Sequence, residues 1–345
     1  MKHNADIYKT IFYVKNINMD QVKWGMIGCG NVTEKKSGPA FSKTANSELV
    51  AVMARNLEKA ADYAKRHNVP KWYNNVDDLI NDPEVNAVYI ATPPDVHLEY
   101  AVKAMRAGKP VYVEKPMARN AAECDTMNAV SKETGMPLFV AYYRRALPYF
   151  LKLKELIDSK IIGDLRFINI CLHWQPYDEE VGENPQPRWR VFPEISGGGH
   201  FHDLASHQFD FLEYVFGPIK NAGGIARNQA GLYKADDIVM ANFEFESGLL
   251  GIGSWCFTVS KNQRMDEAKI IGSKGQITFS FFERFSIKVE TENTTEEFHL
   301  PYPEHVQQPL IELIVKELRG EGKCPCTGIS GGRANLWLDK ITAPE

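Results

Sequence analysis

The chain has 345 residues, of which 44% are hydrophobic and 24% charged, a composition typical of a globular protein long enough for two domains. Its net charge of −4 provides no positive field for nucleic acid, and no apolar run approaches the roughly 18 residues of a membrane span. Six scattered cysteines without a CxxC pair favour reduced thiols and a cytoplasmic location. Residues 1–21 lack the apolar core of a signal peptide and are expected to form an N-terminal extension.

Residues 22–142 alternate short apolar runs with segments of helical spacing. Strands are expected at 22–27, 48–53, 71–73, 87–91, 110–114 and 137–142, with helices that include 57–67, 95–107 and 120–134. Such alternation is typical of βαβ units, so we expect an α/β domain with a parallel sheet covered on both faces.

Residues 143–345 follow a different pattern and are assigned to a second domain. Helices are expected at 149–159, 201–216, 307–319 and 334–341, and strands at 166–174, 237–246, 249–258, 268–271, 276–281 and 285–290. The tight turns between successive strands predict an antiparallel sheet. Apolar and polar residues alternate between 279 and 289, which indicates that one face of this sheet is apolar.

A glycine turn follows the first predicted strand. Gly28 and Gly30 would let the backbone approach a pyrophosphate, with Asn31 and Val32 at the start of the next helix. Thr33 stands where the usual fingerprint has a third glycine, so an ordinary tight turn is the alternative. The position after a first strand nevertheless favours a dinucleotide site.

The end of the second strand bears on which dinucleotide would bind. An NAD site commonly has a carboxylate there for the ribose hydroxyls, whereas this chain has Ala54 and Arg55 and no carboxylate before Glu58. Arg55 could hold a 2′-phosphate, so the sequence favours NADP over NAD. The alternative is a solvated surface arginine, and NAD stays open.

Lys115 ends the fifth predicted strand, between Glu114 and Pro116. Proline disfavours helical geometry at the preceding residue, so the lysine is expected at the carboxyl end of the sheet, where α/β folds bind ligands. There its amine could donate to a substrate oxygen or take part in proton transfer. A structural ion pair with Glu114 is the alternative.

Residues 197–210 combine three glycines with a histidine-rich helix. Asp203, His207 and Asp210 share one stripe, so a carboxylate one turn away could orient the His207 ring. A metal site would need His200 and His202 as well, but His202 points about 100° from the stripe, so we predict no metal. A polar face satisfied by local hydrogen bonds is the other alternative.

The glycine turn, ATPPDVH at 91–97, AGKPVYVEKPMA at 107–118 and GGGHFHDLASHQFD at 197–210 resemble the Gfo/Idh/MocA oxidoreductases, which include glucose–fructose oxidoreductase and the inositol dehydrogenases. The resemblance extends from about residue 22 to the C-terminus. It implies an N-terminal Rossmann domain and a C-terminal α/β domain with an open, mostly antiparallel sheet. Because that sheet commonly forms the interface in the family, the resemblance also implies a homodimer or homotetramer.

The resemblance implies hydride exchange between a nicotinamide and a hydroxyl or keto carbon of a sugar, cyclitol or polyol. His207 would take the hydroxyl proton, Asp203 would hold His207, and Lys115 would hydrogen-bond the substrate oxygen. The residues expected to bind the cofactor are Gly28, Gly30, Asn31, Val32, Arg55, Thr92, Pro93, His97, Glu114 and Lys115. Those expected to bind substrate are Arg144, Arg145, Trp189, Arg190 and His202. For Trp189 and Arg190, anchoring of the loop at 186–193 is the alternative.

Other functions are compatible with the same residues. One is a glycosidase that keeps its nicotinamide bound and cycles through oxidation, elimination and reduction. Another is a non-catalytic nucleotide-binding sensor, and a metal-dependent hydrolase is the last. The sequence does not name the sugar or cyclitol, because specificity depends on the shape of the loop at 175–195.

Overall fold

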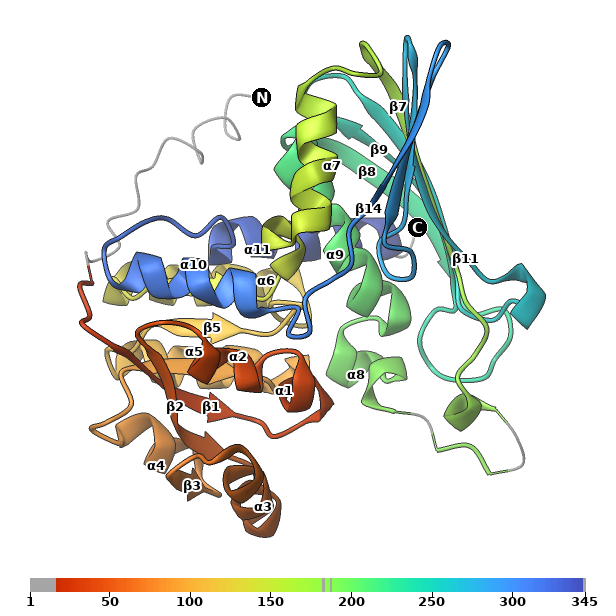
Figure 1. Ribbon diagram of the computed structural model, residues 1–345. Coiled ribbons are helices and arrows are strands. Elements are labelled where there is room, and N and C mark those ends of the chain that lie inside the picture. Colours follow the sequence, from red (N-terminus) through yellow and green to blue (C-terminus); the bar gives the residue numbers. More distant parts are fainter. Residues whose placement is uncertain (1–16, 182–183, 187, 344–345) are drawn as a thin grey trace.

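The structure is a computed structural model that describes residues 17–181, 184–186 and 188–343. Residues 1–16, which form most of the expected N-terminal extension, lie outside the described residues. Two sheets lie side by side, each with its own helices (Figure 1). This arrangement confirms the predicted α/β fold with a parallel first sheet and a mostly antiparallel second one.

The first sheet has six parallel strands in the order β3-β2-β1-β4-β5-β6. Their bounds are β1 Val22–Ile27, β2 Ser47–Met53, β3 Lys71–Tyr73, β4 Ala87–Ile90, β5 Val111–Val113 and β6 Leu138–Val140. Every residue of β4, β5 and β6 is buried, as expected for strands with helices on both faces. The strand order reverses between β1 and β4, so a ligand crevice is expected at their carboxyl ends.

Helices connect these strands and cover the sheet. They are α1 Asn31–Lys35, α2 Gly38–Lys43, α3 Leu57–His67, α4 Val76–Asn81, α5 His97–Arg106 and α6 Ala121–Thr134. Local chemistry explains several of their ends. Asn56 and Asn120 cap α3 and α6 by accepting backbone N–H groups, and α6 ends at Gly135 in the left-handed conformation.

The second sheet has eight strands in the order β14-β13-β12-β11-β7-β10-β9-β8. Their bounds are β7 Leu165–His173, β8 Ile219–Arg227, β9 Ile238–Phe245, β10 Leu250–Cys256, β11 Met265–Gly272, β12 Gly275–Phe279, β13 Ser286–Thr291 and β14 Thr295–His299. All neighbours are antiparallel except β7 and β10. The sequence did not predict β8 and β14, because these edge strands are little buried and lack a regular apolar alternation.

The apolar face predicted between residues 279 and 289 belongs to the core. Phe279, Phe281, Ile287 and Val289 are buried, and α7 (Pro148–Asp158) covers them, with Phe150 and Phe281 5.8 Å apart between ring centroids. The alternation therefore reflects packing inside one chain. Phe285 departs from this pattern and is 37% exposed, and the four most exposed apolar side chains of the sheet are Ile225, Met240, Leu250 and Ile252.

Helix α9 (Gly199–Phe216) joins the two halves of the molecule. The sequence predicts a polar stripe on this helix, but every residue from 199 to 212 is buried. The C-terminal helices α10 (Gln308–Leu318) and α11 (Gly328–Thr342) return to the first domain, where α10 packs on α2 and α11 on α6 and β6. The polar residues of α9 therefore lie between elements and need partners there.

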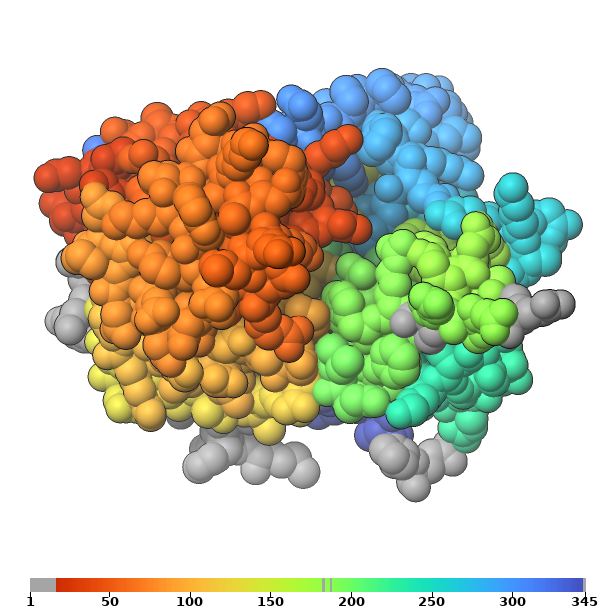
Figure 2. All heavy atoms as spheres, turned by 90° about the horizontal axis from the view of Figure 1, so that it is seen from below, coloured from red at the N-terminus to blue at the C-terminus, as the bar shows by residue number. Residues whose placement is uncertain are grey.

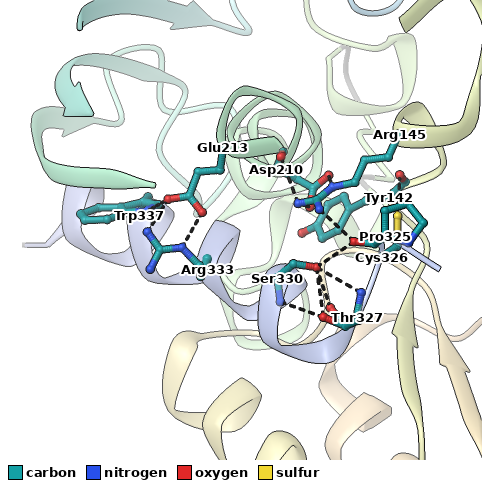
Figure 3. A network of polar contacts seen from close by, with 10 residues as sticks. All are labelled: Tyr142, Arg145, Asp210, Glu213, Pro325, Cys326, Thr327, Ser330, Arg333 and Trp337. Carbon is teal, nitrogen blue, oxygen red and sulfur yellow. Dashed lines mark hydrogen bonds and ion pairs between the residues drawn. The ribbon is translucent and has the colours of Figure 1, made fainter. Parts of the chain in front are cut away.

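Arg145 supplies one such partner and is not free to bind substrate. It follows β6, and its Nε and Nη2 donate to the two carboxylate oxygens of Asp210 at 2.8 and 2.7 Å (Figure 3). Nη1 donates to the carbonyl of Pro325 at 2.9 Å. Because its nitrogens are bonded to buried protein groups, the substrate contact expected of Arg145 is replaced by a structural one.

Two further observations concern the whole fold. In the part of the chain that the structure describes, every helix is too short or too polar to cross a bilayer. The six cysteines are all free thiols.

Replacing Arg145 with methionine should destabilise the protein strongly, because Asp210, only 2% exposed, then loses its counter-charge. We expect a loss of about 3–5 kcal/mol in the free energy of unfolding, measured in urea. The double variant R145M/D210L should recover most of this loss, because it removes both charges. As a control, K220M breaks the exposed Lys220–Glu244 pair and should change stability little. Equal effects of R145M and K220M would contradict the structural role.

Candidate active site

The turn between β1 and α1 requires glycine at residue 28, and at residue 30 it leaves free space beside the backbone. Gly28 has a φ of +105°, and a Cβ there would approach the carbonyl oxygen of Ala91 to 2.7 Å. A Cβ at Gly30 would meet nothing within 4 Å, and no side chain caps the helix that starts at Asn31. The backbone of this turn is thus exposed to a ligand.

The ends of β4 and β5 are tied together by His97. This fully buried ring places Nε2 2.9 Å from the carbonyl oxygen of Thr92 and Nδ1 3.1 Å from that of Pro116. Burial lowers the pKa of His97, so the ring is neutral near pH 7. His97 therefore positions the adjacent strand ends, while Thr92 Oγ1 is buried without a hydrogen-bond partner among the described residues.

Arg55 lies at the end of β2, just before the cap of α3. Its side chain is exposed and makes no hydrogen bond or ion pair with the residues that the structure describes. The open backbone at Gly30, the unpartnered Thr92 hydroxyl and the free Arg55 guanidinium are donors along one edge of the sheet. These groups fit the phosphates and ribose of a dinucleotide.

Lys115 reaches from the end of β5 to α9. Its Nζ lies 2.5 Å from Asp203 Oδ1 and 2.9 Å from the Asp203 carbonyl oxygen. The alternative partner, Glu114, instead accepts from Tyr89 and Gln307, each at 2.6 Å, and from the Lys115 backbone N–H. The lysine side chain thus connects the two domains.

Asp203 also binds a second cation. Its Oδ2 accepts from Arg190 Nε at 2.8 Å, and the Arg190 guanidinium lies over the Trp189 ring, 4.5 Å from its centroid. Burial alone would raise the pKa of Asp203, but the charges of Lys115 and Arg190 hold this pKa well below its usual range. The carboxylate is therefore ionised throughout the physiological pH range.

His207 lies one helical turn beyond Asp203, but no hydrogen bond joins them. Both Asp203 oxygens serve the cations, and His207 Nδ1 is buried without a partner among the described residues. The rings of Tyr143, Tyr142 and Phe282 surround the imidazole at centroid distances of 5.2, 5.9 and 6.2 Å. The expectation that Asp203 orients His207 is therefore corrected: aromatic packing orients the ring.

The charge state of His207 follows from its surroundings. Burial lowers its pKa well below the usual value of 6.5, and the positive charges of Arg144, Lys115 and Lys36 lower it further. The ring is thus neutral near pH 7 and able to accept a proton.

The remaining histidines of α9 have separate partners. His200 pairs with Glu180 at 2.7 Å, and His202 lies 3.7 Å from Asp339. His202 is buried, and its ring lies against Gly198. Among the described residues, no group of three or more His, Cys, Asp or Glu side chains could hold a metal ion.

The structure thus gathers Lys115, Asp203, His207, Arg190 and Arg144 and leaves Arg145 and His202 in other environments. Sequence reasoning missed Tyr143, Phe282 and Lys36. The run YYRR at 142–145, directly after a strand, was a signal for Tyr143, whereas Phe282 comes from a loop with no recognisable motif. Figure 2 shows a cleft between the N-terminal domain (red to yellow) and the C-terminal one (green to blue).

Comparison with known proteins gives a consistent result. Residues 22–142 match the oxidoreductase family with an NAD-binding Rossmann fold, and residues 150–278 match the GFO/IDH/MocA C-terminal domain. Oxidoreductase P35 of Formosa agariphila is 43% identical over 309 residues, which cover 89% of this chain and 94% of that protein. Trans-1,2-dihydrobenzene-1,2-diol dehydrogenase of Mus musculus is 30% identical over 255 residues, 74% and 73% of the two chains.

A solved structure, levoglucosan dehydrogenase in complex with NADH and levoglucosan, has the same fold. It superposes with a TM-score of 0.81 at 22% identity and covers 93% of this chain and 96% of its own. The two family matches together span both domains, and they confirm the resemblance inferred from the motifs. The chain therefore belongs to the Gfo/Idh/MocA family and is an NAD(P)-dependent dehydrogenase.

Proposed function

We propose that the enzyme transfers a hydride between a nicotinamide and a hydroxyl or keto carbon of a sugar, cyclitol or polyol, with NADP as its preferred cofactor. The observation that carries this proposal is the contact of Lys115 with Asp203, which brings an amine of the first domain near the neutral His207 of the second. An amine and an imidazole beside one crevice suit proton transfer to and from a carbinol oxygen.

The cofactor would lie along the edge formed by the glycine turn and the ends of β4 and β5. The backbone of residues 28–32 would hold the pyrophosphate, and Arg55 would hold a 2′-phosphate. Thr92, whose hydroxyl lacks a partner, and Pro93 would flank the nicotinamide end. When bound there, the nicotinamide supplies the acceptor or donor of the hydride.

Lys115 and His207 would divide the work at the substrate oxygen. An ammonium has three N–H donors, and Lys115 uses two of them on Asp203, so one is left for the substrate oxygen. His207 would accept the hydroxyl proton during oxidation and return it during reduction. Asp203, itself bound by Arg190, would hold the amine in place, and the rings around His207 would exclude water.

Two features support a hydroxylated ring as substrate. The stacked Trp189 and Arg190 offer an aromatic surface and a donor, which suit the apolar face and the hydroxyls of a sugar. Two similar proteins are named for hydroxylated rings, a dihydrobenzene diol and levoglucosan.

A homo-oligomer through the C-terminal sheet completes the proposal. Ile225, Met240, Leu250 and Ile252 are each at least half exposed and come from the neighbouring strands β8, β9 and β10. Apolar side chains gathered in this way are typical of a protein interface.

Substituting Ile252 with lysine should therefore shift the protein from dimer or tetramer to monomer, because a charge cannot be buried there unpaired. Light scattering after size exclusion measures the mass. Lys288→Ala, on another strand of the same sheet, is the control. A wild-type monomer at micromolar concentration would refute the interface.

Lys115→Ala and His207→Ala should each lower kcat by about 10²-fold or more, because each removes a group that handles the reacting proton. Turnover is followed at the nicotinamide absorbance, and dinucleotide binding by fluorescence shows that the site remains folded. His299→Ala and Lys220→Ala, both exposed, serve as matched controls. Unchanged turnover would remove that residue from the mechanism. Release of free sugar with no net change in absorbance would instead identify a glycosidase.

Arg55→Ala should weaken NADPH binding about tenfold or more while NADH binding changes little, because only NADPH has the phosphate that the guanidinium would hold. Titration of both dinucleotides measures this difference, and Lys59→Ala, exposed on α3, is the control. Equal losses for both dinucleotides would contradict the NADP preference.

A further inference from the structure

Arg144 is a buried cation with an unused donor. The residue is 3% exposed, and its Nε and Nη2 donate to one acceptor, the carbonyl oxygen of Phe281, at 3.2 and 2.9 Å. Its Nη1 is buried with no hydrogen-bond partner, and no carboxylate of the described residues forms an ion pair with it. A buried charge without a counter-charge is costly, so this arrangement calls for an anionic partner.

The Arg144 guanidinium lies beside two of the rings that surround His207. The Arg144 guanidinium carbon lies 5.3 Å from the Tyr143 ring centroid and 4.6 Å from that of Phe282. The His207 ring packs on the same two rings, at 5.2 and 6.2 Å. His207 and Arg144 are therefore close enough for one small molecule to contact both.

A second unused donor belongs to a ring that packs on Phe282. Trp174 Nε1 is buried without a partner among the described residues, and its ring lies 5.6 Å from Phe282. The Arg264 guanidinium lies over the Trp174 ring, with its carbon 4.8 Å from the ring centroid. Indole and guanidinium groups donate only, so a ligand here must bring acceptors.

The charges around His207 favour the same kind of ligand. Its charged neighbours are Arg144, Lys115 and Lys36, and no carboxylate contributes. Asp203 pairs with Lys115 and Arg190. Arg144 and the exposed Lys36 form no ion pair in the described part of the chain. The surroundings of the imidazole thus have an excess of positive charge.

We propose that the substrate is a sugar acid, whose carboxylate binds Arg144 Nη1 with Trp174 as a neighbouring donor while its carbinol faces His207 and Lys115. This inference rests on the proposed function and names its substrate class. In the oxidation, the carbinol C–H hydride passes to the nicotinamide and the hydroxyl proton to His207, so the carboxylate itself is unchanged. A phosphate of the dinucleotide is the competing anion, and the second test below distinguishes it from the substrate carboxylate.

The first test uses the wild-type enzyme and matched pairs of compounds. D-glucuronate is compared with D-glucose, and D-gluconate with D-glucitol, with each dinucleotide in turn. We expect kcat/KM to be about 10²-fold or more higher for the acid, because a site built for a charged group rejects analogues that lack it. Equal or better turnover of the neutral compounds overturns the sugar-acid proposal and leaves the proposed function standing. No turnover of any compound overturns both, and a preference for D-glucose 6-phosphate overturns the carboxylate assignment.

The second test changes the guanidinium. Arg144→Met should lower the ratio of acid to neutral kcat/KM about 10²-fold, and Arg144→Lys, which keeps the charge, should restore part of it. Arg284→Met, an exposed arginine of the adjacent loop, is the matched control. Dinucleotide affinity, measured by fluorescence, should be unaltered in all three variants. Dinucleotide binding weakened tenfold with an unchanged acid preference would assign Arg144 to the cofactor and overturn the proposal. If Arg144→Met does not fold, Arg144→Lys and the substrate pairs decide.

Discussion

One interaction across the two domains supports the rest of the site. The Lys115 amine, at the end of a buried parallel strand, meets the Asp203 carboxylate of α9 at 2.5 Å. The strand holds the lysine at the edge of the first sheet, and the helix holds the aspartate against the second. Because Arg190 binds the other oxygen of Asp203, this carboxylate is shared by two cations, and no hydrogen bond joins it to His207 in the described part of the chain. The surroundings of His207 and the proposed role of Arg144 depend on this arrangement.

Helix α9 shows how the fold accommodates polar groups in its interior. A helix buried on every side would normally be apolar, yet this one contains Asp203, His207 and Asp210. Each of the three has different neighbours. Asp203 pairs with cations, His207 packs against aromatic rings, and Asp210 forms a bidentate ion pair with an arginine. The Arg145–Asp210 pair, whose arginine also donates to the carbonyl of Pro325, anchors the helix (Figure 3). The polar residues of one helix thus serve stability at one position and catalysis at others.

The electrostatics of the site connect its mechanism with its specificity. Burial and neighbouring cations keep His207 neutral, which suits a proton acceptor. The same cations make the site unfavourable for a cationic ligand and favourable for an anionic one. Arg144 is the buried member of this group that lacks a counter-charge in the described residues, so the field that tunes the base would also select the substrate.

The sequence by itself determined the two sheets, the glycine turn and the positions of Lys115, Asp203 and His207, because alternation, helical period and chain order are local properties that a sequence displays directly. It could not determine which side chains bind one another. Only the tertiary structure decided that Asp203 binds Lys115 and Arg190 and that Arg145 binds Asp210, because side chains far apart in the chain compete for the same oxygens. For the same reason, the apolar alternation near Phe281 showed that a face is buried but not what covers it.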